Sequence, residues 1–244
     1  MDPEVPLVVP EVNPQAILKH KGIIANPNCS TIIMVMALKP IYELAKIKRV
    51  IVSTYQAVSG AGKEGIDELD AQVREHSEGR EMTANILPSA SAEKHYPIAF
   101  NLIPQIDVFC DNLYTKEEMK MVNETKKIME DYEMRITATT IRVPVYRSHS
   151  ESVNIELEKE VDLGVMREAL AKFPGVTVQD DPSKQEYPMP LYTSEKDDVY
   201  VGRLRRDESC EKSYNMWVVG DQIRKGAALN TLQIAETMIK NGWI

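Results

Sequence analysis

Cys29 is the residue of this sequence best placed to act as a nucleophile. It follows an Asn-Pro-Asn turn at 26–28, and the apolar run at 32–38 is typical of a helix packed on a core. Unpaired N–H groups and the positive end of the dipole at a helix N-terminus lower a thiol pKa. The pattern therefore predicts a thiolate that can form an acyl thioester. An unreactive core cysteine at a helix start fits the same position.

A thiol nucleophile needs a partner for proton transfer, and histidine is the usual one near neutral pH. His149 lies in the Arg- and Pro-rich segment 142–150, and in its neutral form it could take the thiol proton. His20, His76 and His95 are alternatives on sequence alone, and a surface loop is an equally ordinary place for such a histidine.

Three charged residues could together recognise a phosphorylated amino acid. Arg142 could hold a carboxylate with two hydrogen bonds, Glu117 an ammonium group and Lys120 a phosphate. Glu117 and Lys120 share one face of the helix that a Thr115-x-x-Glu118 capping box predicts. On spacing alone, a solvated ion pair between Glu117 and Lys120 is the favoured interpretation.

The glycines at 60, 62 and 65 have the spacing of a dinucleotide-binding loop, between a predicted strand and a predicted helix. A Rossmann unit also needs an acidic residue about 20 positions later at a strand end, and Glu81 lies at no clear strand end. The sequence therefore favours a surface loop, whose backbone N–H groups could still contact a phosphate.

The composition narrows the class of protein. Hydrophobic residues make up 43% and charged residues 27% of the 244, as in soluble globular proteins. The net charge of −8 argues against a nucleic-acid or anionic membrane surface, and no apolar run approaches the roughly 20 residues of a membrane span. Three cysteines without a C-x-x-C pair suggest neither a disulfide framework nor a zinc site, and they fit a reducing cytoplasm.

The pattern of apolar residues predicts strands separated by helices, which is an α/β or α+β class. Helices are expected at 29–46 with a break at Pro40, and at 63–78, 115–131, 161–172 and 227–240. Strands are expected at 49–56, 135–143, 152–158, 199–205 and 214–219, with a further short strand at 7–9.

Several longer strings of the chain resemble the aspartate-β-semialdehyde dehydrogenase family. They lie, in the family's order, at 26–31, 52–62, 95–101, 142–151, 217–221 and 225–228. The Asn-Pro-Asn-Cys-Ser-Thr string and the Glu117/Lys120 pair favour this family over the related N-acetyl-glutamyl-phosphate reductases. The resemblance implies an α+β fold with a mixed sheet and helices on one face, of the glyceraldehyde-3-phosphate-dehydrogenase-like C-terminal class. The other face of the sheet is expected to join a second subunit.

The resemblance also implies an activity, which is the NADPH-dependent reductive dephosphorylation of L-aspartyl-4-phosphate to L-aspartate 4-semialdehyde. The reaction lies early in lysine, threonine and methionine synthesis. The matching residues are the nucleophile Cys29, the acid/base catalyst His149, substrate-binding Gln56, Glu117, Lys120 and Arg142, and cofactor-binding Ser59, Gly60 and Gln222. The implied partners are NADP(H), aspartyl phosphate, phosphate and identical subunits in a homodimer or homotetramer. No metal, nucleic acid or membrane is expected.

The resemblance begins after the family's N-terminal NADP-binding domain. We therefore expect 1–26 to be the tail end of that domain, 27–220 the catalytic and dimerisation domain, and 221–244 a C-terminal helix that packs on the NADP-binding domain. On this interpretation the chain is inactive by itself. Two alternatives stay open: a cofactor-free Cys/His enzyme that transfers acyl groups or hydrolyses acyl phosphates, and a non-catalytic dimerisation fragment.

Overall fold

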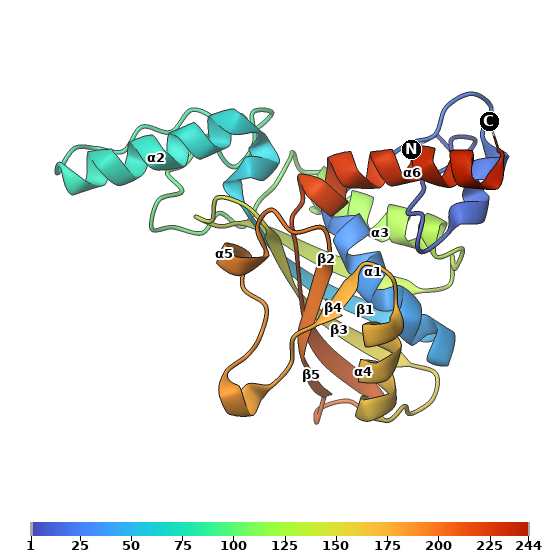
Figure 1. Cartoon of the computed structure of the whole chain (residues 1–244). Coiled ribbons are helices and arrows are strands. Elements are labelled where there is room, and N and C mark those ends of the chain that lie inside the picture. The colour runs from blue at the N-terminus through green and yellow to red at the C-terminus, as the bar shows by residue number, and fades with distance from the viewer. Residues whose placement is uncertain (1, 244) are drawn as a thin grey trace.

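The computed structural model describes residues 2–243, and a six-stranded mixed sheet lies at its centre (Figure 1). The strands are β1 (Ile47–Gln56), β2 (Arg135–Arg142), β3 (His149–Leu157), β4 (Val176–Val178), β5 (Val199–Arg206) and β6 (Ser213–Gly220). Their order is β2-β1-β3-β6-β5-β4. The pairs β1/β2 and β4/β5 are parallel, and the other neighbours are antiparallel. The expected mixed sheet is therefore confirmed.

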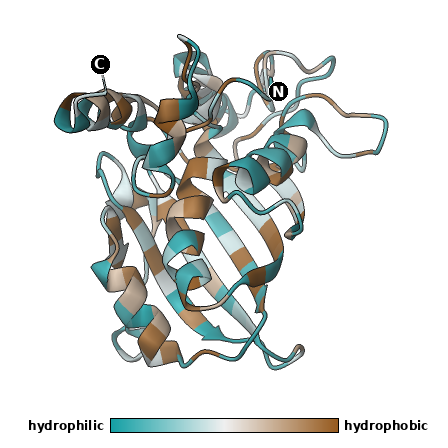
Figure 2. Cartoon of the chain, turned by 90° about the vertical axis from the view of Figure 1, so that its right-hand side faces the viewer, coloured by the Kyte–Doolittle hydropathy of each residue, from teal (hydrophilic) through white to brown (hydrophobic). Residues whose placement is uncertain are grey.

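Three helices cover one face of this sheet: α1 (Cys29–Leu44), α3 (Lys116–Ile128) and α4 (Leu163–Lys172) (Figure 1). Their apolar side chains and those of the strands form the main hydrophobic core. Figure 2 shows hydrophobic segments along α1 and on the strands behind it. The remaining helices are α2 (Lys63–Ser77), α5 (Pro190–Thr193) and α6 (Leu229–Asn241). Short 3₁₀ helices lie at η1 (Pro14–Lys19), η2 (Val58–Ala61) and η3 (Pro182–Lys184), and η4 (Arg224–Ala228) is a π-helix.

Helix α1 begins at Cys29, as the sequence predicts. The Asn28 side chain caps the helix by accepting the Thr31 N–H at 3.0 Å. The expected break at Pro40 is wrong, because α1 continues to Leu44. Proline at this position removes a single i→i−4 hydrogen bond, and the fully buried packing of the surrounding turns holds the helix together.

Helix α2 extends away from the sheet and forms an arm of the molecule (Figure 1). A separate small core holds it, made of Val58, Leu69, Leu87, Ile98, Ala99 and Ile103. Its inner face also carries two buried polar residues, Glu68 and Gln72. The arm therefore depends on polar contacts as well as on apolar packing.

Other elements differ from the expectation at their ends. Strand β3 begins at His149, three residues earlier than expected, and the short strand expected at 7–9 is only a single bridge between Leu7 and Ala25. Strand β4 and helix α5 were not expected. Helix α6 packs against η1 and exposes Leu232 and Ile239. Within residues 2–243, no helix has the length and apolar character required to cross a bilayer.

Candidate active site

Three of the predicted site residues lie side by side across the ends of adjacent strands. Parallel pairing places Gln56 of β1 directly beside Arg142 of β2. On the other side of β1, Gln56 lies one step beyond the Tyr55–Ser150 pair and therefore beside His149 of β3. All three side chains are buried on the face that α1 covers. The sheet therefore presents an arginine, an amide and an imidazole in one row.

Cys29 lies at the start of α1, and the π-helix η4 packs closely on it. A Cβ atom added to Gly226 would lie only 2.9 Å from the Cys29 Cβ. Burial, and next the Glu117 carboxylate, raise the pKa of the Cys29 thiol to about 12. Hydrogen bonding to Ser30 and the charge of Arg142 lower it by less. The predicted lowering of this pKa is therefore wrong for the ligand-free site, because desolvation and Glu117 outweigh the helix N-terminus.

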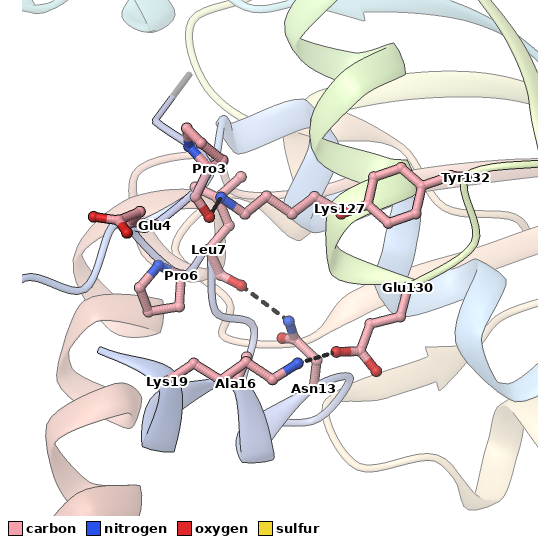
Figure 3. A pocket seen from close by; sticks show the side chains of 10 residues that line it. All are labelled: Pro3, Glu4, Pro6, Leu7, Asn13, Ala16, Lys19, Lys127, Glu130 and Tyr132. Carbon is pink, nitrogen blue, oxygen red and sulfur yellow. Dashed lines mark hydrogen bonds and ion pairs between the residues drawn. The ribbon is translucent and has the colours of Figure 1, made fainter. Parts of the chain in front are cut away.

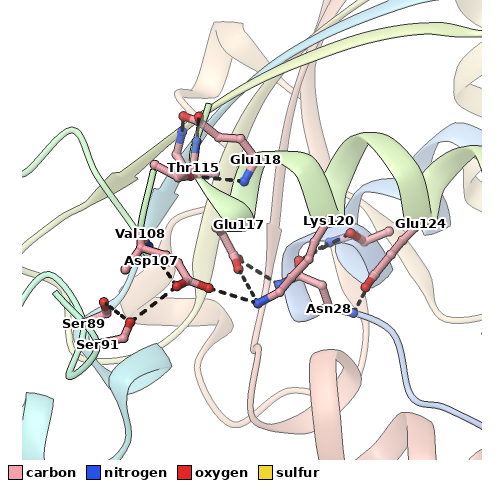
Figure 4. A network of polar contacts seen from close by, with 12 residues as sticks. Asn28, Ser89, Ser91, Asp107, Val108, Thr115, Glu117, Glu118, Lys120 and Glu124 are labelled. Atoms are coloured by element: carbon pink, nitrogen blue, oxygen red, sulfur yellow. Dashed lines mark hydrogen bonds and ion pairs between the residues drawn. The ribbon is translucent and has the colours of Figure 1, made fainter. Parts of the chain in front are cut away.

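Glu117 is the centre of a polar network beside the thiol (Figure 4). Its Oε1 accepts hydrogen bonds from Asn28 Nδ2 at 2.8 Å and from Gln56 Nε2 at 3.2 Å. Its Oε2 lies 3.6 Å from the Lys120 ammonium, which lies 3.4 Å from Asp107 Oδ2. Partial burial lowers the pKa of Lys120, but these carboxylates outweigh it and the net shift is upward. The structure thus brings Glu117 and Lys120 together, with Lys120 at the exposed rim.

Arg142 is held by backbone carbonyls. Its Nε and Nη2 both donate to the Pro88 carbonyl at 3.2 Å, and its Nη1 donates to the Ala57 carbonyl at 2.7 Å. No carboxylate within residues 2–243 forms an ion pair with this guanidinium, and burial lowers its pKa to about 10. Three of its five N–H donors are used, so one remains on each terminal nitrogen. Such a group is suited to binding a carboxylate with two hydrogen bonds.

His149 is fully buried at the start of β3. Its Nδ1 accepts the Ala57 backbone N–H at 3.1 Å, so the neutral ring carries its proton on Nε2. Nε2 is buried and has no partner within the described chain. Burial lowers the pKa of His149 well below its usual value, and Arg142 lowers it further. The expectation that neutral His149 takes the thiol proton is therefore wrong for this tautomer, which presents a donor instead.

The three predicted cofactor residues also meet at this site. Gln222 Nε2 donates a short hydrogen bond to Ser59 Oγ, and Gln222 Oε1 accepts the Ser148 N–H at 2.9 Å. Gln222 therefore ties η2 to the residue that precedes His149. Because both polar ends of its side chain are occupied, its main contribution here is to fix the loop.

Gly60 is required by close packing. A Cβ atom at this position would lie 2.7 Å from Arg142 Nη1 and 3.2 Å from the His149 ring. Glycine is required at position 65 for a different reason, because a Cβ atom added there would collide with the Val58 carbonyl. Neither glycine belongs to a Rossmann unit, because helix α2, which follows η2, extends away from the sheet instead of packing on it (Figure 1). Gly60 and Gly62 are exposed, as the surface-loop interpretation predicts, and Gly60 also packs against the site.

Comparison with known proteins identifies the chain. The family model described as "Semialdehyde dehydrogenase, dimerisation domain" matches residues 38–225. The aspartate-semialdehyde dehydrogenase of Aquifex aeolicus is 55% identical over 246 residues, which cover 100% of this chain and 71% of that protein. The chain belongs to the aspartate-semialdehyde dehydrogenase family. Its members are oxidoreductases of amino-acid biosynthesis.

Solved structures of this family agree with the fold. The Vibrio cholerae aspartate semialdehyde dehydrogenase II superposes with a TM-score of 0.91 at 46% identity, covering 98% of this chain and 69% of that one. The Candida albicans enzyme, whose structure is described as with NADP, has a TM-score of 0.71 at 26% identity, covering 99% and 68%. The relatives are therefore longer than the chain described here.

Away from this candidate site, a cavity of about 250 Å³ lies between the N-terminal segment, η1 and the end of α3 (Figure 3). An ion pair of 2.6 Å between Lys19 and Glu130 and a hydrogen bond from Asn13 to the Leu7 carbonyl cross it. None of the predicted site residues lines this cavity. Its contacts anchor the N-terminal segment.

The other histidines contribute no comparable contacts. His76 lies on the arm helix α2 and stacks on Phe100, with ring centroids 4.6 Å apart. His20 Nδ1 accepts the Gly22 N–H near the N-terminus. Within residues 2–243, no group of His, Cys, Asp and Glu is arranged to hold a metal ion.

Some residues that build the dehydrogenase site could not be singled out from the sequence. Ala57 acts only through its backbone, which serves His149 and Arg142. Glu151 is fully buried, and neither of its oxygens has a partner in the described chain. It lies directly beside Thr54 of β1. A polar residue at a buried position of an alternating strand is the one signal that could have marked Glu151.

Proposed function

We propose that this chain carries the catalytic residues for the NADPH-dependent reductive dephosphorylation of L-aspartyl-4-phosphate to L-aspartate 4-semialdehyde. The observation that supports this most directly is the row of Arg142, Gln56 and His149 at the strand ends, with Arg142 near enough for its charge to act on the Cys29 thiol. The names of its relatives contain aspartate semialdehyde, which is the proposed product.

The substrate fits the charges of the site. Arg142 has two unused N–H donors and no carboxylate partner among residues 2–243, so the α-carboxylate of the substrate supplies the missing counter-charge. The ammonium group pairs with Glu117, and Lys120 at the rim contacts the phosphate. Because an ammonium neutralises Glu117, it also removes one of the causes that keep the Cys29 thiol protonated.

In the first step, the Cys29 sulfur attacks the acyl carbon and the carbon–oxygen bond to the phosphate breaks. The thiol proton leaves with the phosphate, so that an acyl thioester and inorganic phosphate result. His149 donates a hydrogen bond from Nε2 to the carbonyl oxygen as negative charge develops there. To act as an acid, the ring must gain a proton at Nδ1, which breaks the hydrogen bond that this nitrogen accepts from Ala57. The negative charge of the phosphorylated substrate offsets part of that cost.

A bound NADPH supplies the hydride that reduces the thioester. The protein side of that step is the bare backbone of Gly60, which packs directly against Arg142 and His149. Ser59 and Gln222 fix the loop there. These residues fit the nicotinamide end only. We propose that α6, which exposes Leu232 and Ile239, packs against the domain that binds the rest of the cofactor.

Acylation of Cys29 tests the proposed function. The full chain is incubated with β-aspartyl phosphate, and intact mass and peptide mapping locate any aspartyl adduct. We expect a single adduct on Cys29 with stoichiometric phosphate release, absent in Cys29→Ser. Cys210, which is exposed, serves as the internal control for unselective acylation.

Three outcomes would contradict this proposal. Equal labelling of Cys29 and Cys210 would mean that the site does not direct the acyl group. Continuous phosphate release that depends on Cys29 but not on NADPH would favour the cofactor-free hydrolase. No reaction at Cys29 under any condition would favour a non-catalytic dimerisation fragment.

We also propose that the sheet face opposite α1 forms a homodimer. Tyr55 and Trp217 stack there with ring centroids 5.4 Å apart, and both stay partly exposed. Helix α5 lies on the same side (Figure 1) and exposes Leu191 and Tyr192. An apolar, aromatic surface of this kind is typical of a subunit interface, and the matching family model is named as a dimerisation domain.

Leu191→Lys is expected to weaken this dimer at least tenfold, because a charge would be buried at an apolar contact. Leu191 is 78% exposed, so the fold of the subunit should tolerate lysine. The measurement is sedimentation equilibrium over a range of concentrations. The matched control is Leu232→Lys on α6, 55% exposed on a different part of the molecule. A monomeric wild type, or equal weakening by the control, would refute this interface.

A further inference from the structure

Glu68 and Gln72 are buried polar residues on the inner face of the arm helix α2. They are one turn apart, 9% and 0% exposed, where an amphipathic helix would ordinarily present apolar side chains. Neither belongs to the site described above. Their hydrogen bonds show what they hold in place.

The Glu68 carboxylate holds one segment of backbone. It accepts three consecutive N–H groups, from Asn85 at 2.7 Å, Ile86 at 2.8 Å and Leu87 at 3.0 Å. Gln72 holds the flanks of the same loop: its Nε2 donates to the Thr83 carbonyl, and its Oε1 accepts the N–H groups of residues 98 and 99. A single side chain therefore holds all three N–H groups of the segment 85–87, while the Leu87 carbonyl accepts the Tyr96 N–H at 3.0 Å.

The next residue of this segment contacts the active site. The carbonyl of Pro88, which is buried, accepts both Nε and Nη2 of Arg142. This carbonyl occupies the Nε–H and one N–H of Nη2. Its position therefore determines which N–H groups of the guanidinium stay free for a ligand. An unbroken chain of hydrogen bonds and covalent bonds thus runs from Glu68 through 85–88 to Arg142.

We propose that Glu68 is a positioning residue that sets the affinity of Arg142 for the carboxylate of the substrate. The inference rests on the proposed role of Arg142 in binding that carboxylate. Glu68 acts by holding the Pro88 carbonyl against the guanidinium. Without its three bonds, the segment 85–88 loosens and Arg142 loses its fixed orientation.

The test compares Glu68→Gln with wild type in the full chain. Gln keeps the shape of the side chain but replaces one acceptor oxygen with a donor, which faces backbone N–H groups. The first readout is the solvent exchange of the Arg142 Nε–H by NMR, a signal assigned through its loss in Arg142→Lys. The second readout is the dissociation constant of L-aspartate. We expect Glu68→Gln to speed the exchange and to weaken aspartate binding, each by about tenfold.

Three controls separate positioning from general loss of structure. Asp67→Asn changes the same charge on the neighbouring residue, whose side chain is 57% exposed, and should change neither readout. In an Arg142→Lys background, Glu68→Gln should cause no further loss of aspartate affinity, because the two effects share one path. If Glu68→Gln does not fold, Glu68→Asp keeps a carboxylate on a shorter side chain and should give an intermediate exchange rate.

An unchanged Arg142 Nε–H exchange in both Glu68 variants would overturn the inference, as would additive losses in the Arg142→Lys background. Failure of the wild type to bind L-aspartate would instead contradict the proposed substrate. In that case the exchange comparison still decides whether Glu68 positions Arg142.

Discussion

Glu117→Gln is expected to lower the pKa of the Cys29 thiol by about one to three units, which raises the thiolate fraction at pH 8 about ten- to thousandfold. In the wild type this pKa is raised to about 12, first by burial and next by Glu117. Glutamine removes the negative charge but keeps an oxygen that can accept from Asn28 and Gln56. The change therefore isolates the charge of Glu117 from its hydrogen bonds.

The measurement is the rate of Cys29 alkylation by iodoacetamide as a function of pH, followed by peptide mapping. The matched control is Glu130→Gln, an exposed carboxylate just beyond the other end of α3, paired with Lys19. It should leave the pH profile of Cys29 unchanged. An identical profile for Glu117→Gln and wild type would show that the charge of Glu117 does not keep the thiol protonated.

Replacement of Glu151 by glutamine should make the stability of the protein fall less steeply as the pH rises from 5 to 8. The Glu151 carboxyl is fully buried and unpartnered within the described chain, and burial raises its pKa well above the usual value. It is therefore neutral in the folded state and ionised in the unfolded state at neutral pH. Folding takes up a proton, so the free energy of unfolding falls by about 1.4 kcal/mol per pH unit between about pH 4.3 and the raised pKa.

Glu151→Gln removes this contribution to the slope. The measurement is urea unfolding of both proteins at several pH values between 5 and 8. We expect the stability of the variant relative to wild type to improve steadily with pH. The control Glu158→Gln replaces an exposed carboxylate at the end of the same strand, and should leave the slope of the wild type intact. Parallel curves for wild type and Glu151→Gln would show that Glu151 is ionised in the folded protein.

Local sequence signals were sufficient for much of the fold. The Asn28 cap and the Thr115–Glu118 capping box mark the starts of α1 and α3, because each supplies the hydrogen bonds that a helix N-terminus lacks. β-Branched residues located β1, and alternation located β2 and β3. The predicted helix break at Pro40 was wrong, since burial of the surrounding helix outweighs one lost hydrogen bond. Short elements such as β4 carry too few residues to show a period.

For the site, residue types identified the charged and nucleophilic side chains but not their protonation. The thiol pKa of Cys29 depends on how deeply the sulfur is buried and on a carboxylate almost 90 positions away. The tautomer of His149 depends on a backbone N–H of a different strand end. Such properties come from tertiary packing, and no local pattern contains them.

The backbone of Ala57 contacts two side chains of the site. Its N–H donates to the His149 imidazole at 3.1 Å, and its carbonyl accepts from the Arg142 guanidinium at 2.7 Å. Because both groups are main-chain atoms, any side chain small enough for this position preserves them, and only proline deletes the donor. Proton chemistry and substrate anchoring therefore cannot be adjusted independently by a shift at this point. If evolution moved Arg142 so that it bound the carboxylate of a different substrate, the same change would disturb His149. This coupling limits how far the substrate preference can change.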